Sequence, residues 1–105
     1  MDQSPILLHV WSVHPDEGTA LVERLGKMLS HLDGDEGFVS ARILASSDRT
    51  SVAALVEMRS IEDRQRLEAL PEVRETLHAV RGAYNLVIRL YHELEAYGDG
   101  SRTVA

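Results

Sequence analysis

The chain has no cysteine and no long hydrophobic run among its 105 residues. Without cysteine, disulfides and thiolate catalysis are excluded, and a reducing compartment is expected. Apolar stretches such as ILLHVW and NLVIRL are far shorter than the roughly 20 residues that span a bilayer. The N-terminus also lacks a basic region followed by an apolar run. The sequence therefore predicts a cytoplasmic protein without a membrane partner.

Positive charge is scarce as well. The 17 Asp and Glu residues outnumber the 11 Lys and Arg residues, which leaves a net charge of -6. Binding of nucleic acid needs clustered Lys and Arg, so nucleic acid is not expected as a partner. The composition is otherwise globular, with 44% hydrophobic and 27% charged residues. We expect an N-terminal extension over residues 1–5, one domain over 6–97 and a flexible tail over 98–105.

The hydrophobic pattern predicts four strands and two helical regions. The strands are expected over residues 6–14, 38–46, 52–59 and 84–97. Pro15 opens the first helix, which Gly34 ends, whereas Ser60 caps the second helical region, which Pro71 interrupts and Gly82 ends. The order β-α-β-β-α-β predicts an α+β fold of the ferredoxin-like split βαβ type, with a four-stranded antiparallel sheet and its helices on one face.

Strand alternation assigns the side chains to the two faces of this sheet. The uncovered face is expected to mix large apolar groups with charges, and it comprises His9, Trp11, Arg42, Leu44, Leu55, Glu57, Arg59, Arg89, Tyr91 and Glu93. The helix-facing side is expected to be apolar, and it comprises Ile6, Leu8, Val10, Val39, Ala41, Ile43, Ala54, Val56, Met58, Leu86, Ile88 and Leu90. A large apolar area flanked by charges is typical of an interface, so we expect a homodimer through the open sheet face, a dimeric α/β barrel. A monomer whose long side chains cover the sheet is the alternative.

Two interpretations of the helix-facing side remain open, a plain core and a ligand pocket. The small side chains of Ala41, Ala45 and Ala54 favour a void beside Met58, whose flexible side chain suits a flat hydrophobic ligand. The expected partner is therefore a hydrophobic aromatic small molecule. The candidate substrate-binding residues are Met58, Ala54, Ile43, Val56, Leu86 and Ile88.

The candidate catalytic residues are His92, Tyr84 and Ser12. Alternation in the last strand turns His92 toward the helices, where a histidine among apolar neighbours can act as a base near neutral pH. A histidine satisfied at the rim of the core is the structural alternative. Ser12 and Tyr84 are expected on the same face, as a polar end of the pocket. None of the five histidines has ligand spacing, so no metal site is predicted, and no motif indicates a Ser-His-acid triad.

The segment GFVSARILASSDRTSVAALVEMRSIED resembles the antibiotic biosynthesis monooxygenase family of the dimeric α/β-barrel group. Its Gly-Phe-x-Ser strand, Ser-x-Asp hairpin turn and x-Ser helix start match that family, as does the helix interrupted at Pro71. The resemblance covers about residues 5 to 96. It implies a ferredoxin-like dimer with a pocket between sheet and helices, and oxidation of aromatic polyketide phenols or quinols by molecular oxygen without flavin, metal or haem.

Three positions of the family's reaction pattern carry different residues in this chain. Met58 occupies the position of a Trp, Ala54 that of an Asn and Ile43 that of a Tyr. The helix after Ser60 has no histidine over residues 64–70, so the haem-degrading activity of relatives is not implied. Cofactor-free oxygenation needs donors that stabilise a phenolate or carbanion, and these three residues supply none.

Three functions therefore remain open. The first is a cofactor-independent oxygenase that acts on an aromatic or polyketide-type phenol or quinol. The second is a cofactor-free polyketide cyclase or isomerase that uses His92 or Tyr84 as its acid or base. The third is a non-catalytic dimer that binds a small molecule or assists another enzyme.

Overall fold

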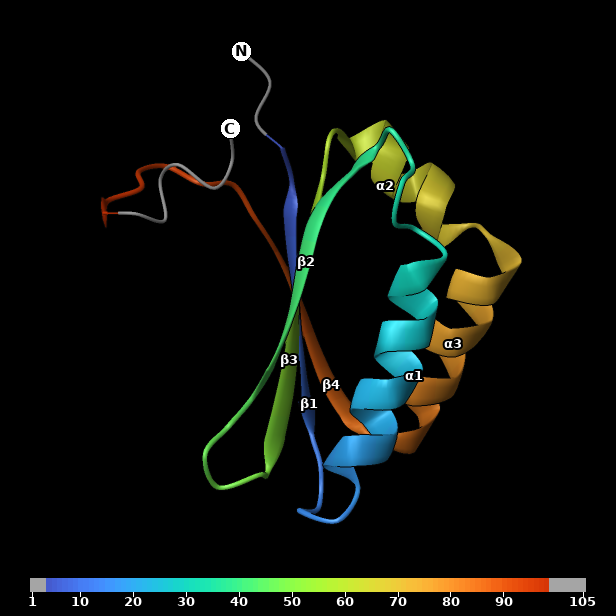
Figure 1. The fold of residues 1–105 in the computed structure, drawn as a ribbon, viewed down its shortest axis with the longest axis vertical. Helices are drawn as coiled ribbons and strands as arrows, with labels where there is room; N and C mark the ends of the chain where they lie inside the picture. The colour runs from blue at the N-terminus through green and yellow to red at the C-terminus, as the bar shows by residue number, and fades with distance from the viewer. Residues whose placement is uncertain (1–3, 99–105) are drawn as a thin grey trace.

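Four strands and three helices make up the computed structural model, which describes residues 4–98 (Figure 1). Most of the predicted N-terminal extension and tail lies outside these residues. The elements are, in chain order, β1 Ile6–Ser12, α1 Gly18–Ser30, β2 Phe38–Ala45, β3 Ser51–Met58, α2 Ile61–Glu68, α3 Pro71–Ala83 and β4 Asn85–Tyr91. Every helix within these residues is too short or too polar to span a bilayer.

The strands form one antiparallel sheet in the order β2-β3-β1-β4. All three helices lie against the same face, and the other face carries no helix (Figure 1). This arrangement is the predicted α+β ferredoxin-like split βαβ fold. Because β1 is a central strand, its inward side chains lie in the middle of the layer between the sheet and the helices.

Helices α2 and α3 begin at signals that the sequence carries. The Ser60 hydroxyl accepts a hydrogen bond of 3.0 Å from the backbone N–H of Asp63, which confirms the predicted cap of α2. Pro71 occupies the first turn of α3, where its missing N–H costs nothing. In α1, Leu21, Leu25 and Met28 are buried along one stripe. This helix starts at Gly18 and ends at Ser30, so it is shorter than predicted at both ends.

The side chains of strand β1 lie on the opposite faces of the sheet from those predicted. Trp11 and His9 are 1% and 7% exposed beneath the helices, whereas Ile6, Leu8 and Val10 lie on the uncovered face. The strand is apolar on both sides, so alternation alone did not determine which side faces the helices. Burying Trp11 removes the largest apolar surface from water, and this side of β1 turns inward.

Smaller corrections concern the strand ends. Strand β4 stops at Tyr91, so Glu93 lies beyond the sheet, and Arg59 follows β3. Val39 lies at an irregularity of the β2–β3 pairing and is 37% exposed. Leu90 points to the helix side as predicted, since it pairs with the buried Leu7, but it remains 43% exposed.

The loop before β2 is tied to the start of α2 by a polar network. The Arg66 guanidinium donates hydrogen bonds of 3.0 and 2.7 Å to the Asp35 carboxylate and one of 3.0 Å to that of Asp63. Gly37 lies between the two segments, and a Cβ built on it would approach the Asp63 Cγ to 2.5 Å. Position 37 therefore has no room for a side chain while Asp63 keeps its place in this network.

Candidate functional site

A buried histidine and a buried tryptophan lie at the centre of the helix-facing sheet. His9 and Trp11 come from β1, and their rings stack with centroids 5.5 Å apart and planes 13° from parallel. The neighbours of His9 in the sheet are Ala54 of β3 and Ile88 of β4. Polar edges of two aromatic rings are thus enclosed in an otherwise apolar layer.

One of these polar edges is buried without a protein partner. The indole Nε1–H of Trp11 is buried and donates no hydrogen bond. The His9 ring nitrogens are not buried without a partner in this way, and the residue is 7% exposed. Buried polar groups are usually hydrogen-bonded in native proteins, and an exception is typical of a functional site or of a bound water. The unpartnered indole N–H of Trp11 is therefore the feature of this layer that calls for an explanation.

The electrostatic surroundings keep His9 neutral. Burial lowers its pKa from 6.5 to about 4, and the positive charges of Arg64 on α2 and Arg81 on α3 act in the same direction. No charged residue of α1 is buried toward the sheet, where that helix presents its leucines and Met28. The site is therefore an apolar layer in a positive field, which favours a bound anion over a bound cation.

The candidate substrate-binding residues surround this pair. Met58, Ala54 and Val56 are buried at 2%, 3% and 5% exposure on the inner side of β3. Ile43, Leu86 and Ile88 are half-buried on the same side of the sheet. Their predicted placement is therefore confirmed, and their role in binding stays a prediction. Ala54 places only a methyl group next to His9, while Met58 adds a flexible chain further along β3.

The three candidate catalytic residues do not join this site. His92 follows the last residue of β4 and is exposed, so the prediction that it faces the helices inside a strand is wrong. Tyr84 caps the end of α3 and packs against the core. Ser12 is exposed at the end of β1, on the side of the sheet without helices. The three residues therefore share no pocket.

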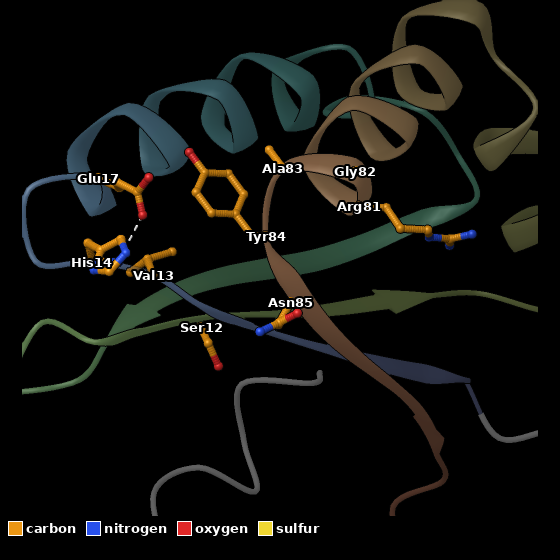
Figure 2. A pocket seen from close by; sticks show the side chains of 9 residues that line it. All are labelled: Ser12, Val13, His14, Glu17, Arg81, Gly82, Ala83, Tyr84 and Asn85. Carbon is orange, nitrogen blue, oxygen red and sulfur yellow. Dashed lines mark hydrogen bonds between the residues drawn. The ribbon is translucent and has the colours of Figure 1, made fainter.

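Ser12 and Tyr84 do border one open hollow of about 490 Å³, formed where β1 ends and β4 begins. Figure 2 shows that Tyr84 points toward the helices, whereas Ser12 and Asn85 point to the opposite side of the sheet. Arg81 is directed away from all three. At the far side, the backbone N–H of His14 donates a 2.9 Å hydrogen bond to Glu17. Because its polar groups do not converge, we do not assign the reaction to this hollow.

Sequence reasoning missed His9 and Trp11 because it oriented β1 wrongly. One signal was present, since the alternate positions Leu7, His9, Trp11 and Val13 include the only tryptophan of the chain. A single tryptophan in a central strand favours the buried side, and period-two alternation then carries His9 inward with it. The departures at Met58, Ala54 and Ile43 therefore do not leave the layer without polar groups.

Comparisons with known proteins agree with this fold. No protein-family model matches the sequence, and no curated protein matches it. Among solved structures, the chain is similar to SnoaB, a cofactor-independent oxygenase from Streptomyces nogalater, with 17% identity over 90% of this chain and 97% of that one, at a TM-score of 0.73. Rv0793 from Mycobacterium tuberculosis is 15% identical over 90% of this chain and 99% of that one, at a TM-score of 0.78.

A protein from Deinococcus radiodurans, assigned by name to the antibiotic biosynthesis monooxygenases, is also 15% identical, over 90% of this chain and 96% of that one, at a TM-score of 0.75. At such identities the likeness shows the fold alone. The chain thus has the fold of the antibiotic biosynthesis monooxygenases, as the sequence resemblance predicted.

Proposed function

We propose that the chain is a cofactor-independent oxygenase that acts on an aromatic phenol or quinol between the sheet and the helices. The observation that carries this proposal is the buried, stacked pair of His9 and Trp11, in which the indole Nε1–H of Trp11 has no hydrogen-bond partner. Its fold is that of SnoaB, which is a cofactor-independent oxygenase. The apolar side chains around the pair suit a flat aromatic ring.

The chemistry requires that a weakly acidic substrate lose a proton before it meets oxygen. An electron-rich phenolate or carbanion reduces molecular oxygen directly, so the protein needs only to favour the anion and to exclude water. In this chain the necessary polar groups come from β1, because β2 and β3 present Ile43, Ala54 and Met58. The alternative cyclase has less support, since His92 is exposed beyond β4.

Oxygen consumption tests the proposal. Metal-free and flavin-free protein is mixed with a hydroxyanthrone in an oxygen-electrode cell, and we expect uptake of one O₂ per molecule converted to the quinone, with release of water. Protein that binds the hydroxyanthrone without consuming oxygen would support the non-catalytic alternative instead.

We further propose that the uncovered sheet face forms a homodimer. Ile6, Leu8 and Val10 join the exposed Val87 there, so the face is more apolar than the sequence predicted. The segment after β4 leaves the sheet on this same side (Figure 1). It carries Leu94, which is 86% exposed. An apolar face of this kind is typical of a twofold interface between identical subunits.

Sedimentation velocity tests the dimer by comparing the wild type with a variant that carries a charge on the uncovered sheet face. Val87 pairs with Val10 in the sheet, and Val87→Asp would bury a carboxylate in the interface, so we expect a dimer for the wild type and a monomer for the variant. The matched control is Ala79→Asp on the exposed side of α3, which should stay dimeric. A wild type that sediments as a monomer, or a dimeric Val87→Asp protein, would contradict the proposal.

A further inference from the structure

We propose that a hollow between the start of α1 and the hairpin turn of residues 46–50 binds a zwitterionic amino acid with an apolar side chain. The hollow lies at the start of β3, whereas Met58 is the last residue of that strand. Its lining includes neither His9 nor Trp11. The proposal therefore goes beyond the proposed oxygenase and does not depend on it.

The hollow has a volume of about 310 Å³ and lies where two segments meet at one end of the sheet (Figure 1). The segment that leads into α1 contributes Pro15, Gly18, Thr19, Val22 and Glu23, and the hairpin contributes Ala45, Arg49, Ser51 and Val52. The side chains of Val22 and Val52 are half-buried and buried. This volume is at the lower end of the range for small-molecule pockets, so the hollow suits a ligand with a short apolar group.

Two opposite charges border this hollow without pairing. Glu23 comes from α1 and Arg49 from the facing hairpin, and both residues are exposed. Within residues 4–98, neither side chain forms a hydrogen bond or an ion pair, either with the other or with a third residue. The pair can therefore bind the ammonium and carboxylate groups of one ligand by charge-assisted hydrogen bonds.

The backbone of Arg49 has an unfavourable conformation. With a φ of 65°, Arg49 is the one non-glycine residue of the described chain in the left-handed region. Glycine or asparagine is usual at such a position of a turn. Backbone conformations of this kind are costly and gather at sites that bind ligands. The turn alone thus does not explain why this position carries an arginine.

Hydrogen bonds hold the hairpin turn in this conformation. The Asp48 carboxylate accepts hydrogen bonds of 2.7 Å from the hydroxyl groups of Ser46 and Thr50 and one of 3.1 Å from the backbone N–H of Thr50. The backbone N–H of Arg49 donates a 3.0 Å hydrogen bond to the carbonyl oxygen of Ser46. The backbone on both sides of Arg49 is therefore fixed at the border of the hollow.

The two charges and the apolar lining together define the class of ligand. Glu23 repels a simple carboxylate and Arg49 repels a simple amine, whereas a zwitterion is attracted by both. An aliphatic side chain of the same ligand then contacts Val22 and Val52. Because both charges are exposed, each ion pair is weak, so we expect a dissociation constant of about 1 mM for an amino acid such as L-leucine.

Titration of ¹⁵N-labelled wild-type protein with L-leucine tests the site by NMR. The amide signals of Gly18, Arg49 and Val52 should shift and reach saturation. The matched ligands are 4-methylpentanoate, which lacks the amino group of leucine, and 3-methylbutylamine, which lacks the carboxylate. Each should bind at least about tenfold more weakly than leucine. This comparison needs no variant, so it does not depend on the folding of one.

Three variants separate binding from a structural role. Arg49→Gly removes the guanidinium and relieves the backbone, so leucine binding should weaken by about tenfold while the urea midpoint of unfolding rises. Glu23→Gln should weaken leucine binding and strengthen that of 4-methylpentanoate, because the repulsion of the carboxylate is lost. The matched control Glu75→Gln, on the exposed side of α3, should bind both ligands as the wild type does.

Gly18→Leu should abolish binding by filling the hollow. A Cβ built on Gly18 lies 3.9 Å from the Val52 Cγ2, an ordinary contact, so a larger side chain has room to extend there. Unshifted signals of Gly18 and Val52 in the wild type at about 20 mM leucine would overturn the proposal. Equal affinity for leucine and its two analogues, or equal leucine affinity of Arg49→Gly and the wild type, would overturn it as well.

Discussion

The free energy of unfolding is expected to fall by up to about 3 kcal/mol as the pH is lowered from 6.5 to 4, because of His9 alone. The pKa of His9 is about 4 in the folded protein, against 6.5 for an exposed histidine. Between these values the unfolded chain binds a proton that the folded chain does not. Stability is therefore complete above pH 6.5 and is lost as the pH falls toward 4.

Urea unfolding at a series of pH values measures this loss, at one protein concentration because a dimer would make stability concentration-dependent. His9→Phe should remove the loss in this window while keeping equal or higher stability at pH 7, since it replaces a desolvated polar ring in an apolar layer with an apolar ring. Asp35 and Asp48 act outside this window, because their pKa values are lowered to about 2 and their contributions to stability are lost only below pH 3.8. Equal pH dependence in both proteins would show that His9 is not held neutral.

Gly37→Ala is expected to lower the free energy of unfolding by about 1 to 3 kcal/mol, although it adds only a methyl group. The new Cβ would lie 2.5 Å from the Asp63 Cγ and 2.7 Å from its Cβ, so the backbone of one segment must move. Asp63 has little freedom to move, because it holds the Ser60 cap and the Arg66 guanidinium. The variant should therefore loosen the joint between β2 and α2.

Gly26→Ala is the matched control for this substitution. Gly26 lies inside α1 with no atom within 4 Å of a built Cβ, and alanine is the better helix former by roughly 1 kcal/mol. The two glycine variants should thus change stability in opposite directions in the same urea experiment. Equal stability of Gly37→Ala and the wild type would mean that the contact between the loop before β2 and the start of α2 is not rigid.

The fold could be predicted because several local signals agree. Ser60 with Asp63, Pro71 and the stripe of Leu21, Leu25 and Met28 each determine a helix, and β3 alternates clearly enough to orient its inner residues. Once the order of elements is known, the split βαβ arrangement follows. These same signals placed the candidate substrate-binding residues on the correct face.

The site was harder to predict, because β1 is apolar on both of its sides. Which side of β1 faces the helices depends on how well each side packs against them, and that is a property of the assembled core. His92 was misplaced for a related reason, since Leu90, His92 and Leu94 continue the alternation of β4 after the sheet ends. Pairing with a neighbouring strand ends at Tyr91, and the sequence of β4 does not encode that limit.

The proposed oxygenase site at His9 and Trp11 is tested most directly by oxygen uptake. The rates of wild-type and His9→Phe protein with a hydroxyanthrone are measured side by side without metal or flavin. Because the proposed site is built around His9 and Trp11, we expect uptake by the wild type and a rate lowered by about 100-fold or more in the folded variant. Uptake at the same rate by both proteins would contradict the assignment of the reaction to the His9 and Trp11 pair.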